Sequence, residues 1–273
     1  MKITVIFTCF NRKEKTLECV ERLIEGNKKI EFQFVIVDDG STDGTKDALR
    51  ECVYASKLSV LETEGNCYYS GGMHQGMQYI FNAGIKSEYL LMVNDDVKFF
   101  DNSIEKLVEL SRQKEKAVIV GVTCDEYGKQ TYGAIRYDGG FSVRYQTVPL
   151  AEKEECDTFN ANCVLIPYEL FEKTGAMDSM YIHSLGDFDY GLSLKKKGGK
   201  IYSSDEFVGV CNRNSIQGTW LDKNLSLKKR LKLKESPKGA PAKQWFYFLN
   251  KNFGVMKAMV FTVTPYVNLF LGR

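Results

Sequence analysis

The sequence predicts an α/β protein with a mostly parallel central sheet, and two features of its first 120 residues carry that prediction. Short apolar segments alternate there with amphipathic segments of helical length, which is typical of parallel strands joined by right-handed crossover helices. Residues 34–37 and 89–93 contain no charged side chain, as expected of strands buried on both faces of a sheet. We therefore expect a Rossmann-like first half.

The elements of this half follow one another regularly. The helix at 13–24 places Leu17, Val20 and Leu23 on one face, and Asp101-Asn102 is expected to cap a later helix. The expected strands are residues 3–7, 34–37, 58–61, 89–93 and 117–121. The expected helices are residues 13–24, about 45–52, 72–83 and 103–114.

After Gly121 the elements become shorter, and the pattern predicts a mixed half that covers the open side of the first. Residues 127–140 are rich in Gly, Tyr and Asp and are expected to form a hairpin or a loop excursion. Strands are expected at 159–167, 201–202 and 206–210, and helices at 168–173 and 186–197. The predicted organisation is one domain at 1–220, divided near residue 121, followed by an extension at 221–273.

The composition is that of a soluble globular protein, with 273 residues of which 44% are hydrophobic and 26% charged. Eight cysteines are scattered without a C-x-x-C pair and only two histidines accompany them, so a zinc site is not expected. Free thiols favour a cytoplasmic protein. Met1-Lys2 leads directly into the first strand, so no signal peptide is expected.

Charge is distributed unevenly along the chain. Residues 223–243 hold eight basic residues and one acidic residue, a net charge of +7, whereas the whole chain carries +2. The apolar run at 253–271 is interrupted by Pro265 and is short for a membrane-spanning helix. Together these features predict peripheral contact with an anionic membrane through 223–273. A helix packed on the core or on another subunit is the alternative, and nucleic acid is not an expected partner because no binding motif accompanies the lysines.

Two acidic clusters, Asp38-Asp39 and Asn94-Asp95-Asp96, each follow an apolar strand directly. Ligands of open parallel sheets bind beyond the carboxyl ends of the strands. Neighbouring carboxylates repel each other unless a cation or a donor compensates them, so the clusters predict a divalent cation that holds a phosphate-bearing ligand. An acidic turn followed by a helix N-cap is the alternative.

Four short segments occur in order along the chain: VIFTCFNR at 5–12, VDDGSTDGT at 37–45, NDD at 94–96 and GDFDY at 186–190. Together they resemble the family 2 glycosyltransferases of the GT-A fold, whose V-D-D-G-S-x-D-x-T, D-x-D and E-D-x-D motifs follow one another in this way. The resemblance spans residues 3 to about 220. It implies a nucleotide-sugar-binding half at 1–121 and an acceptor-side half at 122–220.

The resemblance implies an inverting enzyme that moves a sugar from a UDP- or dTDP-linked donor to a hydroxyl of a glycan acceptor. The segments resemble those of rhamnosyltransferase-like enzymes most. A lipid-linked glycan of bacterial surface polysaccharide is the expected acceptor, because it would explain a basic and apolar tail that contacts the inner face of the cell membrane. The alternatives are a sugar-phosphate nucleotidyltransferase and a catalytically silent nucleotide-sugar-binding protein. A nucleotidyltransferase should carry a Gly-rich loop with Arg and Lys after its first strand, and residues 9–12 do not form one.

The resemblance also assigns the donor site. Asp96 is the expected direct ligand of Mg²⁺ or Mn²⁺, Asp95 is expected at the ribose, and Asn94 replaces the first acid of the D-x-D motif without its charge. Asp39 is expected at the nucleobase, and Asp38 either there or as a brace of its loop. The other expected nucleotide-sugar-binding residues are Thr8, Phe10, Asn11, Arg12 and, in a Gly-rich loop that opens a helix, Gly71 and Gly72.

Inverting transfer needs a base that takes the proton of the acceptor hydroxyl. The resemblance assigns this role to Asp187, with Asp189 as the alternative, because an acid in the first turn of a helix is also favoured by the helix dipole. Many relatives carry a His after the last core strand, where this chain has Cys211 or Asn212. Trp220 is expected either as a stacking platform for the acceptor or as a core residue.

Overall fold

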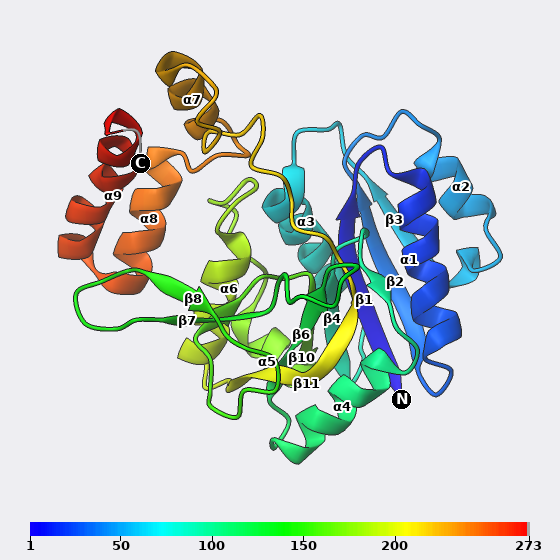
Figure 1. Cartoon of the computed structure of the whole chain (residues 1–273). Coiled ribbons are helices and arrows are strands. Elements are labelled where there is room, and N and C mark those ends of the chain that lie inside the picture. Colours follow the sequence, from blue (N-terminus) through cyan, green and yellow to red (C-terminus); the bar gives the residue numbers. More distant parts are fainter. Residues whose placement is uncertain (272–273) are drawn as a thin grey trace.

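The computed structural model describes residues 1–271, which form a large mixed sheet with helices on both faces (Figure 1). Its eight strands lie in the order β3-β2-β1-β4-β10-β6-β11-β5, and a separate three-stranded sheet has the order β8-β7-β9. The α/β class predicted from the sequence is confirmed.

The first four large strands form the parallel part of the sheet. They are β1 (Lys2–Cys9), β2 (Glu31–Asp38), β3 (Leu58–Glu62) and β4 (Tyr89–Val93), and every pairing among them is parallel. Residues of the apolar runs in β2 and β4 are almost fully buried, which agrees with the prediction from their composition. Because these strands run in one direction, the segments that follow β1, β2 and β4 meet at one edge of the sheet.

The second half of the chain places an antiparallel strand in the sheet. β10 (Cys163–Pro167) runs antiparallel between β4 and β6 (Val118–Cys124), so the strand expected at 117–121 is not a direct neighbour of β4. The strand expected at 159–167 is divided into β9 (Thr158–Phe159) and β10. The prediction of one continuous strand there was wrong, because the chain changes sheets between the two.

Two other predicted elements also differ. The short strands expected at 201–202 and 206–210 are one strand, β11 (Ile201–Val210), whose register shifts as it pairs with β6 and with the edge strand β5 (Lys98–Phe99). The region expected at 127–140 contributes β7 (Ala134–Tyr137), which pairs with β8 (Tyr145–Thr147) beyond its predicted end.

Two helical layers enclose the large sheet. One contains α1 (Lys13–Gly26), α2 (Thr45–Glu51) and α4 (Ser103–Gln113), with a short 3-10 helix at Ala55–Lys57, and its apolar side chains share a core with β1 and β2. The other contains α3 (Tyr68–Asn82), α5 (Tyr168–Thr174) and α6 (Gly186–Lys196). The helix expected from residue 72 therefore begins four residues earlier.

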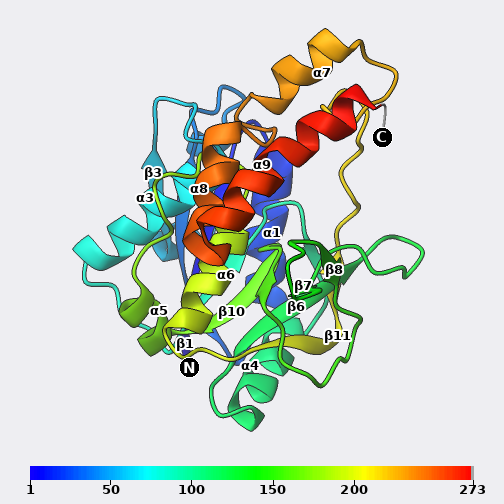
Figure 2. The same cartoon turned by 90° about the vertical axis from the view of Figure 1, so that its left-hand side faces the viewer.

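The extension after residue 220 forms three helices, α7 (Leu227–Lys234), α8 (Ala242–Phe253) and α9 (Val255–Phe270), the last of which contains Pro265. α8 packs on the domain, because Phe248 and Leu249 share a small core with Tyr181 and Phe188. This part of the tail thus follows the alternative prediction, a helix packed on the core. α9 lies across α8, beside α7 (Figure 2). Within residues 1–271, no helix has the length and apolar character to cross a membrane.

Candidate active site

A cavity of about 1060 Å³ opens beyond the carboxyl ends of β1 and β4. Its walls come from both halves of the domain and from the extension. Of the predicted site residues, those that line it are Thr8, Phe10, Arg12, Asp39, Asn94, Asp95, Asp96 and Asp187. Trp220 and the segment 236–240, which joins α7 to α8, close the cavity from the side of the extension.

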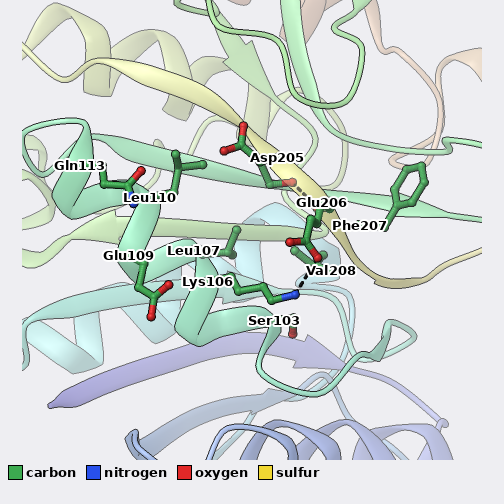
Figure 3. A pocket seen from close by; sticks show the side chains of 11 residues that line it. Ser103, Lys106, Leu107, Glu109, Leu110, Gln113, Asp205, Glu206, Phe207 and Val208 are labelled. Carbon is green, nitrogen blue, oxygen red and sulfur yellow. Dashed lines mark hydrogen bonds and ion pairs between the residues drawn. The ribbon is translucent and has the colours of Figure 1, made fainter.

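A smaller hollow of about 160 Å³ lies between α4 and β11, and the Lys106–Glu206 ion pair crosses it (Figure 3). Its lining residues come from outside the four family-like segments. The larger cavity is therefore the candidate site.

Arg12 ties the end of β1 to the acidic cluster that follows β4. One guanidinium nitrogen donates to Asp95 Oδ1 at 2.9 Å and to Asp96 Oδ2 at 3.2 Å. Asp95 is 3% exposed and also accepts from Thr16 Oγ1 at 3.0 Å, so both of its oxygens are bound within the protein. Burial raises the pKa of Asp95, while the Arg12 charge opposes that shift. Asp96 is more open, with 22% of its side chain exposed, and presents the available carboxylate of this cluster.

Asp38 and Asp39 have different surroundings. Asp38 accepts from the Ser41 backbone N–H at 2.9 Å and braces the turn after β2. Asp39 accepts from Thr63 Oγ1 at 2.7 Å and from the N–H groups of Cys67 and Tyr68 at 2.9 and 2.8 Å, so it caps the start of α3. Asp39 nevertheless lines the cavity, as Thr8 and Phe10 do.

Asn11 holds two loops together outside the lining of the cavity. Its side-chain oxygen accepts from the Thr42 N–H at 2.7 Å, and its own N–H donates to Ser41 Oγ at 2.9 Å. Asn11 has a φ of 50°, a left-handed conformation that Asn tolerates better than most residues. The structure thus gives Asn11 a role in shaping the loop that presents Phe10 and Arg12.

Gly71 and Gly72 both lie inside α3, whereas the predicted helix began at Gly72. The Gly71 N–H donates to the carbonyl of Ile182 at 3.0 Å, so this amide is already paired within the protein. A Cβ at Gly72 would lie 2.5 Å from Thr8 Cγ2, so this glycine allows α3 to approach β1. The first turn of α3 was predicted as a loop because the glycines there lower helix propensity.

The two acids of α6 are directed to different places. Asp187 lines the cavity and accepts from the N–H groups of Ala161 and Phe188 at 3.3 and 2.9 Å. Its burial raises the pKa of this carboxyl to about 6, although those N–H groups favour the charged form. Asp189 is 1% exposed and is bound by Lys251 Nζ and Asn252 Nδ2 of α8, each at 2.7 Å.

Three polar side chains that the sequence motifs did not indicate also line the cavity. Within residues 1–271, Tyr69 Oη, Tyr137 Oη and His183 Nδ1 are buried atoms without a hydrogen-bond partner. Burial, with a contribution from Lys238, lowers the pKa of His183 to about 4, so its ring is neutral at neutral pH. Burial raises the pKa of Tyr69 and of Tyr137, and the Asp187 charge adds to both shifts. Water or a polar ligand in the cavity can form the hydrogen bonds that these atoms lack within the described protein.

The backbone beside these side chains is strained. Tyr68 and Leu185 line the cavity with φ values of 53° and 72°, a conformation that is unfavourable for residues with a Cβ. Ser70 Oγ donates to the His183 carbonyl at 2.7 Å and fixes one strained segment against the other. Sequence patterns carry no signal for such contacts, because they join residues 113 positions apart.

The fit of a divalent cation depends on Asp96. Within the described residues, no three His, Cys, Asp or Glu side chains form a metal site by themselves. Mg²⁺ is commonly bound by one or two carboxylates together with substrate phosphates and water, and Asp96 in an open cavity fits that arrangement. Cys211 donates its thiol hydrogen to Asp96 Oδ1 at 3.8 Å, and a thiol is a poor ligand for Mg²⁺.

Comparisons with known proteins agree with this architecture. A family model described as Glycosyl transferase family 2 matches residues 4–186. Glycosyltransferase GlyG of Streptococcus pneumoniae serotype 4 is 28% identical over 123 residues, which are 44% of this chain and 38% of that protein. The chain thus spans well under half the length of this curated relative.

Several solved structures have a similar fold. S. aureus TarS has a TM-score of 0.58 at 18% identity, over 93% of this chain and 44% of TarS. A 1–349 fragment of TarS in complex with UDP-GlcNAc has a TM-score of 0.58 at 16% identity, over 97% and 74% of the two chains. The mannosyltransferase PcManGT from Pyrobaculum calidifontis, in complex with GDP-Man and Mn²⁺, has a TM-score of 0.57 at 14% identity, over the same shares. The GT-A fold expected from the sequence is confirmed.

Proposed function

The chain belongs to glycosyl transferase family 2, and on that premise we propose that it transfers a sugar, with inversion, from a UDP- or dTDP-linked donor to a hydroxyl of a glycan acceptor. The observation that carries this proposal is the position of Asp96 and Asp187 on one cavity. The segment 160–162 connects them, because Ala161 donates to Asp187 while the Asn162 carbonyl accepts from the Asn94 N–H at 3.1 Å.

The donor side of the cavity suits a nucleoside diphosphate. When bound between Asp96 and the diphosphate, Mg²⁺ or Mn²⁺ would neutralise the charge that develops on the leaving group. Arg12 holds Asp95 and Asp96 in place and brings one further positive charge to the cavity. Thr8, Phe10 and Asp39 are proposed to contact the nucleobase, with Phe10 half-exposed at the rim.

The acceptor side supplies the base. In the proposed step, the acceptor oxygen bonds to the anomeric carbon while the bond from that carbon to the phosphate oxygen breaks, and the acceptor proton passes to Asp187. A pKa of about 6 leaves most of this carboxylate ionised at neutral pH while keeping it more basic than an ordinary Asp. The bonds from Ala161 and Phe188 fix its orientation.

Tyr69, Tyr137 and His183 are proposed to bind the hydroxyls of the sugars beside Asp187. They are uncharged at neutral pH, since the pKa of His183 is about 4, and their polar atoms have no partner within residues 1–271. An uncharged wall of this kind favours neutral sugars over acidic ones. Trp220, on the side of the extension, is proposed as the stacking platform for the acceptor.

The solved neighbours support the class of donor, because their structures hold UDP-GlcNAc in one case and GDP-Man with Mn²⁺ in another. Three further parts of the proposal rest on the sequence resemblance. They are the choice of UDP or dTDP as the nucleotide, a rhamnosyl-type sugar, and a lipid-linked acceptor of bacterial surface polysaccharide. A lipid-linked acceptor also implies that the protein works at the inner face of the membrane.

Turnover of nucleotide sugars tests this function against its rivals. UDP- and dTDP-sugars are incubated with the protein, with and without Mn²⁺, and release of the nucleoside diphosphate is measured. The transferase predicts slow Mn²⁺-dependent release that Asp96→Ala abolishes. Asp47→Asn, which changes an exposed first-turn acid of α2, is the control and should behave as wild type.

The other outcomes identify the rivals. Tight binding of a nucleotide sugar without turnover on any acceptor would favour the silent binding protein. Formation of a nucleotide sugar from a nucleoside triphosphate and a sugar phosphate would favour the nucleotidyltransferase.

A further inference from the structure

Helix α9 exposes a continuous apolar face. Seven apolar side chains of α9 are between 47% and 72% exposed: Val255, Met256, Met259, Val260, Val263, Val267 and Phe270. The polar Thr264 and Asn268 are exposed at the border of this group. At about 100° per residue, the seven apolar positions fall within about 140° of the helical wheel, so they form one face. Monomeric soluble proteins seldom leave so large an apolar face uncovered.

The opposite side of α9 is firmly attached to the protein. Ala258 and Leu269 are buried, and Trp245 of α8 donates its indole N–H to the carbonyl of Phe261 at 3.0 Å. α9 packs along α8 in a fixed orientation (Figure 2). Because its buried residues make this contact, its exposed apolar side chains are directed away from α8. This face is part of the folded structure and does not arise from a loose tail.

Basic residues lie on α7, the helix that packs on α9. α7 packs on α9 through Lys234, a fully buried side chain whose ammonium group lies 3.9 Å from the centre of the Tyr266 ring and 2.9 Å from Glu235 Oε1. With Lys234 used in this contact, the exposed lysines of α7 are Lys228, Lys229 and Lys232. The segment 223–243 as a whole carries the net charge of +7.

We propose that the apolar face of α9 and the exposed lysines of α7 form one docking surface for a bilayer that contains anionic lipids. Val, Met and Phe side chains would enter the boundary between headgroups and acyl chains, and the lysines would contact the lipid phosphates. Charge complementarity selects this occupant, because a second copy of the chain would bring the same positive charge to the surface. The sequence predicted membrane contact through all of 223–273. In the structure α8 packs on the domain, so the proposed contact is limited to α7 and α9.

The attached side of α9, opposite its apolar face, borders the candidate active site. Pro265 of α9 and Lys238 in the segment between α7 and α8 both line the large cavity. A bilayer docked on α9 would therefore lie close to the cavity, where a lipid-linked acceptor could enter. This last consequence rests on the proposed function, but lipid binding itself does not.

Vesicle sedimentation tests the surface without any turnover. The full chain is mixed with vesicles of phosphatidylcholine alone or with a third of phosphatidylglycerol, and the bound fraction is measured at low and high salt. We expect binding to the anionic vesicles that weakens with salt. Lys228→Gln/Lys229→Gln/Lys232→Gln should weaken it by about 100-fold, at roughly fivefold for each lysine. Met259→Glu/Val263→Glu should abolish it.

The control is Val53→Glu, which changes an exposed apolar residue between α2 and β3 that is 88% exposed. It should bind vesicles as the wild type does, and circular dichroism should show all variants folded. The proposal is overturned if wild type does not bind anionic vesicles, or if Met259→Glu/Val263→Glu binds them equally well. It is also overturned if light scattering shows a dimer that this double variant dissolves, with no vesicle binding, since a second copy would then cover the face.

Discussion

Asp187 and Asp189 are two residues apart on α6, yet Asp187 lines the cavity while Asp189 is bound to Lys251 of α8 at 2.7 Å. Residues at this spacing lie on nearly opposite sides of a helix, so only one of them can face the substrate. The contact of Asp189 with Lys251 also joins the domain to the extension that closes the cavity. One acid is thus available for chemistry and the other holds the site together.

Replacing Asp187 by Asn should reduce the rate of sugar transfer by about 100-fold to 10,000-fold, because the amide does not accept the acceptor proton. Binding of the nucleotide sugar should be nearly unchanged, since the role proposed for Asp187 concerns the acceptor. Transfer assays and titration calorimetry measure the two effects. Equal losses of transfer and donor binding would contradict the role of base.

The rate should depend on pH through the same carboxyl. Asp187 acts as a base only when ionised, so the rate should rise with pH up to its pKa of about 6 and level off above it. A pH profile measured between about pH 4.5 and 8 tests this expectation. A rate that falls as pH rises through 6 would contradict it.

Asp187→Asn should also change stability. The pKa of Asp187 is higher in the folded protein than the roughly 3.9 of an unfolded Asp. The contribution of this carboxyl to the free energy of unfolding is therefore fully present below about pH 4, where it is protonated in both states, and is lost as pH rises through 6. At neutral pH the variant should therefore unfold at a higher temperature than wild type, with a gain of about 1 to 2 kcal/mol. Thermal unfolding at pH 4 and pH 7 measures the difference, and an equal gain at both pH values would disagree with this origin.

Two adjacent glycines of α3 should respond differently to alanine. A methyl group at Gly72 would lie 2.5 Å from Thr8 Cγ2, so Gly72→Ala should cost about 1 to 3 kcal/mol of stability and weaken donor binding by displacing Thr8. At Gly71 the nearest atoms are 3.8 Å away, so Gly71→Ala should be neutral or stabilise the helix by up to about 1 kcal/mol. Urea unfolding and nucleotide binding compare the pair. Similar effects of both changes would argue against the close approach of α3 to β1.

Lys251→Met should destabilise the protein by about 3 kcal/mol. The change removes the positive charge that faces the buried Asp189 and leaves Asn252 as its partner from α8. Adding Asp189→Asn should recover much of this loss, since the uncompensated charge is then removed. Denaturant unfolding of the two single variants and the double variant gives the coupling energy. Simple additivity of the two changes would show that the pair is not coupled.

The parallel strands and the acidic segments after them were predictable from local sequence. Continuous apolar runs identify strands that are buried on both faces, and the carboxyl ends of parallel strands converge on one edge. This is why the sequence alone was enough to expect Asp39, Asp96 and the end of β1 in one place.

The contacts that give each acid its role depended on distant residues. Asp39 accepts from the N–H of Tyr68, the first residue of α3. This contact could not be predicted, because Gly71 and Gly72 lower the helix propensity of the first turns and the helix was expected to begin later. The insertion of β10 beside β4 brings Ala161 and Asn162 to the cavity, and no periodicity in the sequence indicates that pairing.

Local hydrophobic patterns and short motifs were enough to identify the family, the parallel half and the acidic residues that meet at its edge. Three features became visible in the folded chain alone: Asp187 faces the cavity while Asp189 is bound to α8, α8 belongs to the domain, and α9 keeps an apolar face exposed. Burial and ion pairing depend on which surfaces pack together, and the residues on those surfaces lie tens of positions apart in the chain.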